Sequence, residues 1–594
     1  MAAVAEARTR KLARGLARGR RRQDGVALAL YTAAWLALIG RDAVADPAHT
    51  CACRVTSDPT AYMWSFVWWP HAIVHGLNPF FTHAIWPPGT NVGATATVPA
   101  VGLALSPITA ALGPIVTYNV TSLLGPVLAA WLMFRLCRYL TGRWVPSLVA
   151  GYIFGFSSYV LAHMFGHLNL VLIFVLPAAA HLILLRLDER VRSRRFVGLM
   201  AGLLVLQFLI STEVLLTMLG FGALALVFGY VFESPSRRAR IRSLVPQVLL
   251  AGAIAAVVLG PFVYYAAKGI APNPSVAWES NANLFSTDPL NYAIPTPVTW
   301  IGHQLTGSLA PKFISDDGGA HGKYDESAAY LGLPLLVLVG WFLVARRRRT
   351  AARVLAGLLV VVGLASLGAH LHVVNPPHGA DTVYRGKSIP LLWLPMSHLP
   401  VVDHVLPARL ALYVFFIAAI VVALALAEPG RRRGPRWALA GVGVLALLPN
   451  QALPYWHGRP QDPRFFTTSL YQRYLHRDEI VLVVPFGWNG NSMLWQAETG
   501  MRFRMVGGYL SPEVPPGYWR EPVVRALLAS PAKPVSLRRW QGPLRDLIVR
   551  RRVGAVVVGP GASTGWSRVV ASLGLTPLPA GDVVVYDVPP GWRA

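Results

Sequence analysis

Eleven stretches of the chain are apolar over most of their length and are separated by polar segments. They cover residues 25–41, 116–138, 144–162, 168–186, 196–210, 213–232, 245–266, 328–345, 351–369, 409–428 and 437–451. A helix that crosses a bilayer needs about 20 mostly apolar residues. Hydrophobic residues make up 54% of the 594 residues and charged residues only 14%, against about 25% charged in a soluble domain. The pattern predicts an α-helical polytopic membrane protein with about 11 transmembrane helices in residues 25–451.

The basic residues distinguish the two sides of this membrane domain. Arginine-rich clusters lie at residues 8–22, 135–143, 186–195, 237–242, 346–353 and 431–436. If the basic N-terminal segment 1–24 is cytoplasmic, every one of these clusters falls on the cytoplasmic side, as the positive-inside rule requires. The net charge of +27 therefore indicates orientation in a cell membrane, and we expect no nucleic acid as a partner.

The same orientation places four long segments outside the cytoplasm. They are the loops 42–115, 267–327 and 370–408 and the tail 452–594. Long ordered loops usually carry function, so we expect the chemistry on the outer side. The alternative for the start of the chain is a signal peptide cleaved near Ala43-Val44-Ala45. The remaining topology needs no cleavage, which favours a first span that is retained.

The tail 452–594 is predicted to be an extracytoplasmic α/β domain. Three β-branched runs, 480–485, 553–558 and 583–588, are typical of buried strands and alternate with predicted helices at 521–530, 543–551 and 563–573. A glycine-containing segment, 559–564, follows one strand, but Thr564 stands where a dinucleotide fingerprint needs glycine. Pro560 also lacks an amide for a phosphate, so we expect no nucleotide cofactor.

Carboxylates at the predicted outer membrane surface are the first candidates for chemistry. Asp58 precedes Pro59 at the start of a predicted helix, 60–76, where it either caps the helix or acts as a general base. Glu213, Glu326 and Asp288 also lie in or next to outer loops. A carboxylate that sinks to the middle of a bilayer costs about 2.5–3.5 kcal/mol, so it usually marks a function or a pair. We therefore predict a polar cavity on this side, in which Glu213 contacts an acceptor or forms a salt bridge.

Other polar residues of the outer segments complete the predicted site. The candidate substrate-binding residues besides Glu213, Asp288 and Glu326 are Asn78, His167 and Asn169. Arg409, together with Lys387 and Arg385, is a candidate for binding a phosphate group. A guanidinium at headgroup depth can bind phosphate bidentately. A lone histidine or an interfacial arginine can equally be structural.

No metal or other cofactor is predicted. Histidine and carboxylate side chains of one outer loop could offer ligands, but their spacing fits no known ligand pattern. These are His303, Asp316, Asp317 and His321. A divalent metal is therefore the alternative and not the expectation.

The cysteines are predicted to have no role in the fold. Cys51 and Cys53 are separated by one residue, so a bridge between them would close a very small ring. A redox role or a role in fixing the loop is the alternative.

Several strings of the membrane part resemble bacterial members of the GT-C superfamily of integral membrane glycosyltransferases. They are Ser57-Asp58-Pro59, His75-Gly76-Leu77-Asn78-Pro79-Phe80, Gly166-His167-Leu168-Asn169, Ile210-Ser211-Thr212-Glu213, Asp288 and Tyr330-Leu331-Gly332-Leu333-Pro334. The long first outer loop, its apolar segment 98–112 in an interfacial or re-entrant position, and the outer tail also match that pattern. One departure is Ser57, where relatives commonly have glycine.

The resemblance implies a polyprenyl-phosphate sugar as donor, a cell-envelope glycan or glycolipid as acceptor, and a GT-C-like fold in the bilayer. Asp58 would be the general base on the acceptor hydroxyl, and the cations would stabilise the leaving lipid phosphate. The alternatives are a transporter of lipids or small molecules and a non-catalytic protein of envelope assembly or export. Transporters often have interrupted helices at matching positions of two halves. This sequence shows no such pair, which argues against a transporter.

Overall fold

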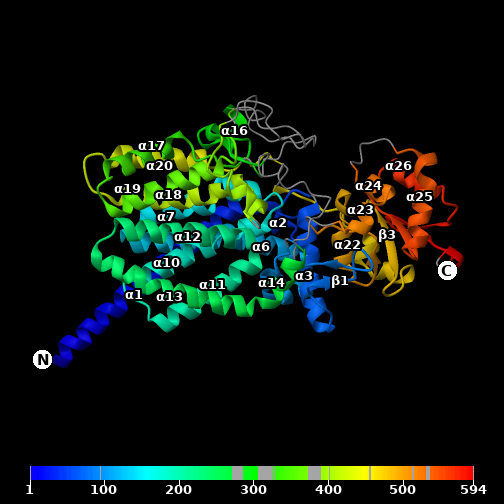
Figure 1. Cartoon of the computed structure of the whole chain (residues 1–594), viewed down its shortest axis with the longest axis horizontal. Helices are drawn as coiled ribbons and strands as arrows, with labels where there is room; N and C mark the ends of the chain where they lie inside the picture. Colours follow the sequence, from blue (N-terminus) through cyan, green and yellow to red (C-terminus); the bar gives the residue numbers. More distant parts are fainter. Residues whose placement is uncertain are drawn as a thin grey trace.

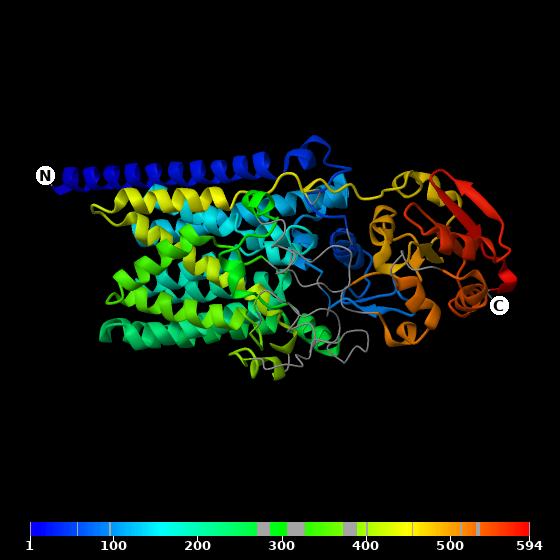
Figure 2. The ribbon, with the colours of Figure 1, turned by 90° about the horizontal axis from the view of Figure 1, so that it is seen from above.

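The computed structural model describes residues 2–592 except 56, 94, 96, 270–284, 306–325, 327, 372, 374–388, 400–401, 454–455, 511–513 and 530–534. The side chains of residues 2–18, 20, 269 and 305 are likewise outside the description. The molecule is elongated (Figures 1 and 2), with a bundle of nearly parallel helices at one end and the tail at the other. The first outer loop lies between them.

Each of the eleven apolar stretches contains a helix. The helices are α1 (Ala2–Leu38), α6 (Pro114–Thr141), α7 (Trp144–Gly155), α8 (Ser158–His163), α9 (Leu168–Val171), α10 (Val175–Leu187), α11 (Ser193–Ile210), α12 (Thr212–Phe232), α13 (Pro235–Val258), α14 (Gly260–Gly269), α17 (Leu333–Ala345), α18 (Thr350–Ser366), α19 (Ala411–Ala427) and α20 (Arg433–Ala446). In the described part of the chain, seven helical segments are long and apolar enough to cross a membrane, and α17 and α18 are shorter apolar helices. The protein is thus a mostly helical membrane protein, and the number of eleven spans stays a prediction.

Helix α19 occupies the centre of the bundle. In the span Pro407–Ala427, 83% of the most apolar window is buried, against 17% for Thr212–Phe232. Helix α7 packs closely on α6, because a Cβ at Gly155 would lie 2.5 Å from the carbonyl oxygen of Pro126. Small residues allow such close approach of helices in a membrane. The apolar surface left on α12 and α13 suits contact with lipid.

The first outer loop folds into short elements above the bundle. They are α2 (Arg41–Ala45), α3 (Ser57–Val74), β1 (Phe81–Thr82), β2 (Thr90–Asn91), α4 (Pro99–Ala104) and α5 (Ser106–Leu112). The last two lie in the segment predicted as an interfacial or re-entrant helix. The other outer loops contain η1 (Pro289–Tyr292), α16 (Trp300–Leu305), η4 (Met396–His398), η5 (Val402–His404) and η6 (Pro407–Leu410).

The expectation that Cys51 and Cys53 are bystanders is wrong, because the structure joins them in a disulfide. Their Cα atoms are 5.2 Å apart, within the usual range for a bridge. Both side chains are fully buried, and Cys51 forms a β-bridge with Gly458 at the start of the tail. The disulfide therefore lies at a junction of loop and tail that sequence spacing does not reveal.

The tail contains a five-stranded mixed sheet of order β4-β3-β5-β7-β6. The strands are β3 (Ile480–Val484), β4 (Arg504–Met505), β5 (Ala555–Val558), β6 (Pro577–Ala580) and β7 (Val583–Asp587). The helices are α21 (Arg464–Thr467), η8 (Ser469–Arg473), η9 (Gly487–Asn489), α22 (Ser492–Glu498), α23 (Pro516–Trp519), α24 (Pro522–Leu528), α25 (Leu537–Arg550), α26 (Thr564–Ala571) and η10 (Pro590–Trp592). Strand β3 is parallel to β4 and β5, and β7 is antiparallel to its neighbours.

Backbone pairing joins the first outer loop to this sheet. Ile85 forms a parallel bridge with Met505 of β4, and the amide of Met505 donates to the carbonyl of Ala84 at 2.7 Å. The indole of Trp64 also donates to Gln496 at 2.6 Å. The tail and the loop therefore share one interface, and independent folding of residues 452–594 stays a prediction.

Candidate active site

The candidate site lies between the bundle and the tail, where the ends of several helices and the loops next to them come together. It contains Asp58 in the first turn of α3, His163 at the end of α8, His167 just before α9, Glu213 in the first turn of α12, Glu326, and Arg409 in η6. Apart from the neighbouring pair of histidines, these residues come from well-separated parts of the chain. The fold therefore unites five of the residues proposed from the sequence and adds His163.

Arg409 connects two of the carboxylates. Its Nε lies 3.1 Å from both carboxylate oxygens of Glu326, and its Nη1 donates to Glu213 at 2.6 Å. Nη2 also donates to Glu326, so every guanidinium nitrogen is engaged. The second oxygen of Glu213 accepts from the amide of Leu406 at 3.2 Å. This outcome agrees with the salt-bridge alternative for Glu213 and engages Nε and both Nη atoms of Arg409 with carboxylates.

Two histidines surround Glu326. The His167 Nδ1 lies 3.7 Å from one oxygen of Glu326, and the His163 Nε2 lies 3.9 Å from the other. Burial lowers the pKa of His167 to about 4, so its imidazole is neutral at neutral pH. Burial alone would raise the pKa of Glu326, but Arg409 and the histidines hold it well below its usual range. The site therefore contains an ionised, deeply buried carboxylate beside a neutral imidazole.

Asp58 is the most accessible of the three carboxylates, with 29% of its side chain exposed. Its Oδ1 accepts a hydrogen bond from the Tyr509 hydroxyl of the tail at 2.7 Å, and its Oδ2 lies 3.7 Å from the His167 Nε2. Helix α3 begins at Ser57, so Asp58 lies within the first turn and is not the N-cap. The capping alternative for Asp58 is therefore wrong, and its carboxylate faces the tail.

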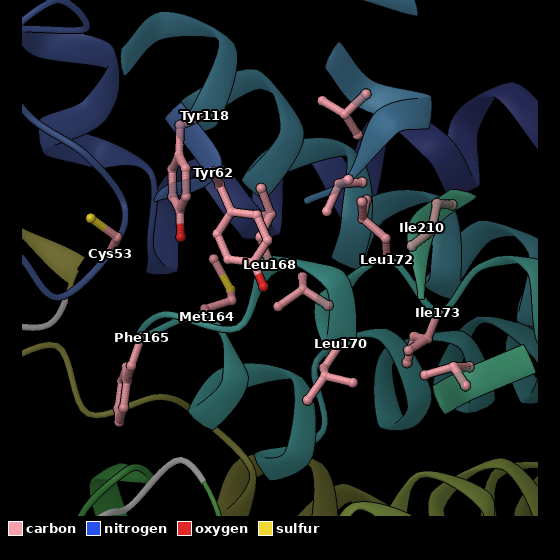
Figure 3. Close-up of a cluster of buried hydrophobic side chains, with 14 of the residues drawn as sticks. Cys53, Tyr62, Tyr118, Met164, Phe165, Leu168, Leu170, Leu172, Ile173 and Ile210 are labelled. Atoms are coloured by element: carbon pink, nitrogen blue, oxygen red, sulfur yellow. The ribbon is translucent and has the colours of Figure 1, made fainter. Parts of the chain in front are cut away.

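Buried aromatic side chains form the floor beside Asp58. Tyr62 and Tyr118 lie side by side, with their hydroxyl groups toward the segment that carries Met164 and Leu168 (Figure 3). The Tyr62 hydroxyl donates to Asn169 at 2.6 Å. Tyr62 lies one helical turn after Asp58 on α3, so it fixes the distance between α3 and α9. Asn169 thus binds Tyr62 beside the site and is not in contact with the cluster of three carboxylates.

The described residues of this group carry a negative net charge. Three carboxylates, of Asp58, Glu213 and Glu326, face the guanidinium of Arg409 among them. Opposite charges within about 4–6 Å stabilise each other, but one guanidinium cannot neutralise three carboxylates. The arrangement favours a cation or a proton from a substrate over an additional anion.

One group of side chains could hold a metal. His163, His167 and Glu326 each offer one ligand atom, and these atoms lie within 4.8 Å of one another. Nitrogen and carboxylate ligands of this kind suit zinc and related ions. Glu326 already accepts from Arg409 through both oxygens, so a metal would have to share this carboxylate. The expectation of no metal stays a prediction.

Four of the remaining predicted site residues lie away from this group or outside the described residues. Asn78 donates to the Tyr265 hydroxyl at 2.7 Å and so connects the first outer loop to α14. Asp288 is 3% exposed and caps η1 through the amide of Leu290. Lys387 and Arg385 lie outside the described residues, as do Asp316, Asp317 and His321, whereas His303 lies in α16.

Sequence reasoning missed Tyr509, His163 and Tyr118. Tyr509 is 451 residues from Asp58, and no local pattern indicates such a pairing. His163 is 1% exposed within an apolar stretch, where a single histidine is usually structural. The spacing of His163 and His167, one helical turn apart, is the only signal that could have placed both on one face.

The fold is similar to that of two solved glycosyl-transferring proteins. An arabinofuranosyltransferase, AftD from Mycobacteria, superposes with a TM-score of 0.54 at 17% identity, over 96% of this chain and 41% of that chain. An oligosaccharyltransferase from Archaeoglobus fulgidus superposes with a TM-score of 0.53 at 11% identity, over 93% of this chain and 71% of that chain. The resemblance to GT-C glycosyltransferases is thereby supported at the level of the fold.

The chain belongs to the family described as a domain of unknown function, DUF6311, whose model matches residues 29–378. That range contains Asp58, the two histidines, Glu213 and Glu326, but neither Arg409 nor the tail. A search of curated proteins found no match. The chain spans less than half the length of the mycobacterial transferase, and identities this low carry the fold and not the activity.

Proposed function

We propose that this protein is a membrane glycosyltransferase that moves a sugar from a polyprenyl-phosphate donor to a cell-envelope glycan or glycolipid on the outer side of the membrane. The fold supports the class of reaction. The observation that carries the proposal is Asp58, a partly exposed carboxylate held by Tyr509 at 2.7 Å next to a group of buried charges. The N-terminus would be cytoplasmic and the tail extracytoplasmic.

In the proposed reaction, Asp58 is the catalytic base. The acceptor hydroxyl gives its proton to Asp58 while its oxygen bonds to the anomeric carbon, and the bond from that carbon to the phosphate oxygen breaks. Polyprenyl phosphate leaves with the electron pair of that bond. Tyr509 holds one carboxylate oxygen, and the other oxygen, which lies 3.7 Å from the His167 Nε2, accepts the proton in this proposal. General-base catalysis of this kind is typically worth about 10²–10⁴-fold in rate.

Arg409 takes a different part in this proposal from the one that the sequence suggests. Its guanidinium holds Glu213 and Glu326 together, so the best-supported role is to position the two carboxylates. Direct binding of the donor phosphate by Arg409 would have to share this guanidinium with the two carboxylates. Lys387 and Arg385 remain proposed phosphate ligands, and Asn78, His167, Asn169, Glu213, Asp288 and Glu326 remain proposed substrate-binding residues.

The release of free polyprenyl phosphate tests this function. Full-length protein in lipid nanodiscs is incubated with a panel of polyprenyl-phosphate sugars and an extract of envelope glycans. We expect release with at least one donor, and a loss of about 10²–10⁴-fold in Asp58→Asn. Asp46→Asn removes the same charge from the same loop, where Asp46 pairs with the exposed His49, and should retain turnover within about twofold.

Three outcomes would contradict the proposal. Normal turnover in Asp58→Asn would exclude Asp58 as the base and make Glu213, Asp288 and Glu326 the next candidates. Movement of lipid or glycan without cleavage of the donor would favour the transporter. Absence of both would favour the non-catalytic assembly protein.

A further inference from the structure

The outer surface of α25 carries an unusual density of arginine. The exposed residues Arg538, Arg539, Arg545, Arg550 and Arg552 are here called the arginine face. The opposite side of α25 buries Leu544, Leu547 and Ile548 against the tail. At 100° per residue, the four arginines within α25 share its exposed half. The exposed Asp546 lies on the same half of the helix, so this surface presents five arginines against one carboxylate of α25.

Membrane topology does not explain this face. The arginines of the bundle lie between spans, where the positive-inside rule accounts for them. The tail lies on the other side of the first outer loop, and that loop, residues 42–115, contains a single basic residue, Arg54. The arginines of α25 therefore require an explanation other than membrane topology. Its location also excludes the bilayer around the bundle as its partner, because α25 lies at the end of the molecule remote from the bundle (Figures 1 and 2).

Aromatic side chains hold several of these guanidinium groups in place. The guanidinium of Arg545 lies over the ring of Trp592 at 4.5 Å, and that of Arg539 over Trp540 at 4.8 Å. Stacking on an aromatic face orients the guanidinium and leaves its N–H groups at the edge available to oxygen ligands. Arg550 is held differently, by an ion pair with Glu521 at 2.9 Å. The face thus presents oriented donors, which lowers the entropic cost of binding.

The spacing of the donors suits an extended polymer of like charges. Arg538 and Arg545 lie seven residues apart, or about 10 Å along the helix axis, and the whole face extends over roughly 20 Å. Guanidinium groups bind carboxylate and phosphate bidentately. We infer that the arginine face binds an acidic polysaccharide of the cell envelope, one that carries carboxylate or phosphate groups along its length. This inference rests on the proposed orientation and narrows the proposed acceptor to an anionic glycan.

Binding of a model polyanion tests the inference without any need for turnover. Full-length protein in nanodiscs of zwitterionic lipid is titrated with polygalacturonate, and with uncharged dextran for comparison. We expect polygalacturonate to bind with an affinity that falls as salt is added, since exposed charges are screened, and dextran not to bind. Arg538→Gln combined with Arg539→Gln and Arg545→Gln should weaken binding by about tenfold or more, a loss of about 1.4 kcal/mol.

A matched triple variant controls for the loss of net charge. Arg192, Arg194 and Arg195 are exposed in and just before α11 on the predicted cytoplasmic side, and their change to Gln removes the same three charges. This control should bind polygalacturonate within about twofold of the wild type. Equal weakening in both triple variants, or no weakening in the α25 variant at an unchanged unfolding temperature, would overturn the inference.

A second probe separates the polysaccharide from a lipid surface. Vesicles that contain phosphatidylglycerol present phosphate in a bilayer. If the α25 variant loses vesicle binding but keeps polygalacturonate binding, the partner is a membrane and the inference is wrong. The proposed enzymatic function fails separately, when no donor releases polyprenyl phosphate, and that result leaves the binding measurements unaffected.

Discussion

The two ends of α19 carry opposite arrangements of the same two residue types. At the outer end, Arg409 binds two carboxylates, those of Glu213 and Glu326. At the other end, the Glu428 carboxylate accepts from Arg346 at 2.7–3.0 Å and from Arg349 at 2.8 Å, and lies 3.8 Å from Arg436. One end thus has an excess of negative charge and the other an excess of positive charge.

The difference separates a structural cluster from a candidate site. Around Glu428, the arginines lie at the end of α19 that is predicted to be cytoplasmic, and Arg436 also donates to the carbonyl groups of Ala425 and Glu428. Around Arg409, three carboxylates and two histidines lie close together. The positive-inside rule concerns lysine and arginine and does not explain such a group. Buried groups held in a charged state at such a position are candidates for function. The comparison therefore favours a structural role for the Glu428 end of α19 and makes the Arg409 end the candidate for chemistry.

Reversal of the proposed orientation would have the largest effect on this comparison. Alkaline phosphatase fused after Ala594 should be active, because the tail is expected outside the cytoplasm, and green fluorescent protein fused there should be dark. A phosphatase fusion truncated after Arg348, between α17 and α18, should be inactive. The opposite pattern would place the Arg409 cluster in the cytoplasm and remove the basis for an outer site.

The next largest effect is expected at Glu428. Removal of one partner from a buried ion pair costs about 3–5 kcal/mol, so Glu428→Gln should lower the unfolding temperature strongly while turnover per folded molecule is retained. Burial raises the pKa of Glu428, but hydrogen bonds and charges from the arginines outweigh it and lower the pKa below its ordinary value. The contribution of Glu428 to the stability of the fold is therefore present above about pH 4.3, the ordinary pKa of a glutamate. This contribution is lost as the pH falls through the lower pKa that Glu428 has in the folded protein.

A thermal unfolding series in nanodiscs at several pH values measures this contribution. Glu189→Gln is the control, since Glu189 forms an exposed pair with Arg240 at 3.2 Å, and such pairs are worth about 0–1 kcal/mol. A loss of turnover in Glu428→Gln without a loss of stability would show that the cytoplasmic-side cluster is not merely structural.

Arg409→Lys sharpens the assignment of the outer cluster. A lysine keeps the charge but cannot hold Glu213 and Glu326 through several fixed donors. We expect turnover to fall by about 10–100-fold, or about 1.4–2.7 kcal/mol, with the affinity for polyprenyl phosphate changed by less than about threefold. The control is Arg436→Lys at the other end of α19, which should lower stability and leave turnover unchanged. A parallel loss of affinity and turnover in Arg409→Lys would instead support direct binding of the donor phosphate.

The smallest effect on stability is expected at Glu498, a carboxylate that is influenced by the carboxylate of Asp462. Burial, with a contribution from Asp462, raises the pKa of Glu498 in α22 to about 7. Because the folded value exceeds the unfolded value of about 4.3, the stability falls as the pH rises from about 4.3 to 7. Glu498→Gln should therefore stabilise the protein by about 1–2 kcal/mol at pH 8 and very little at pH 4.5. Equal effects at the two pH values in thermal unfolding would contradict the assignment.

The sequence by itself determined the membrane domain and the candidate carboxylates. The eleven apolar stretches all contain helices, because hydrophobic length and helical hydrogen bonding are local properties that a bilayer enforces. The β-branched runs at residues 480–485, 553–558 and 583–588 became β3, β5 and β7 for a similar local reason. Asp58, Glu213 and Glu326 could be singled out because a carboxylate at the edge of an apolar stretch is costly unless it is paired or functional.

Only the tertiary structure decided which of these groups meet. Arg409 appeared free in the sequence, yet its three nitrogens contact carboxylates that lie 196 and 83 residues away. Tyr509 reaches Asp58 because the first outer loop extends the sheet of the tail through Ile85 and Met505. Gly458 of the tail in the same way pairs with Cys51 and packs against its Sγ. Contacts of such long sequence separation arise from the packing of whole elements, and no local pattern of polar and apolar residues contains that information.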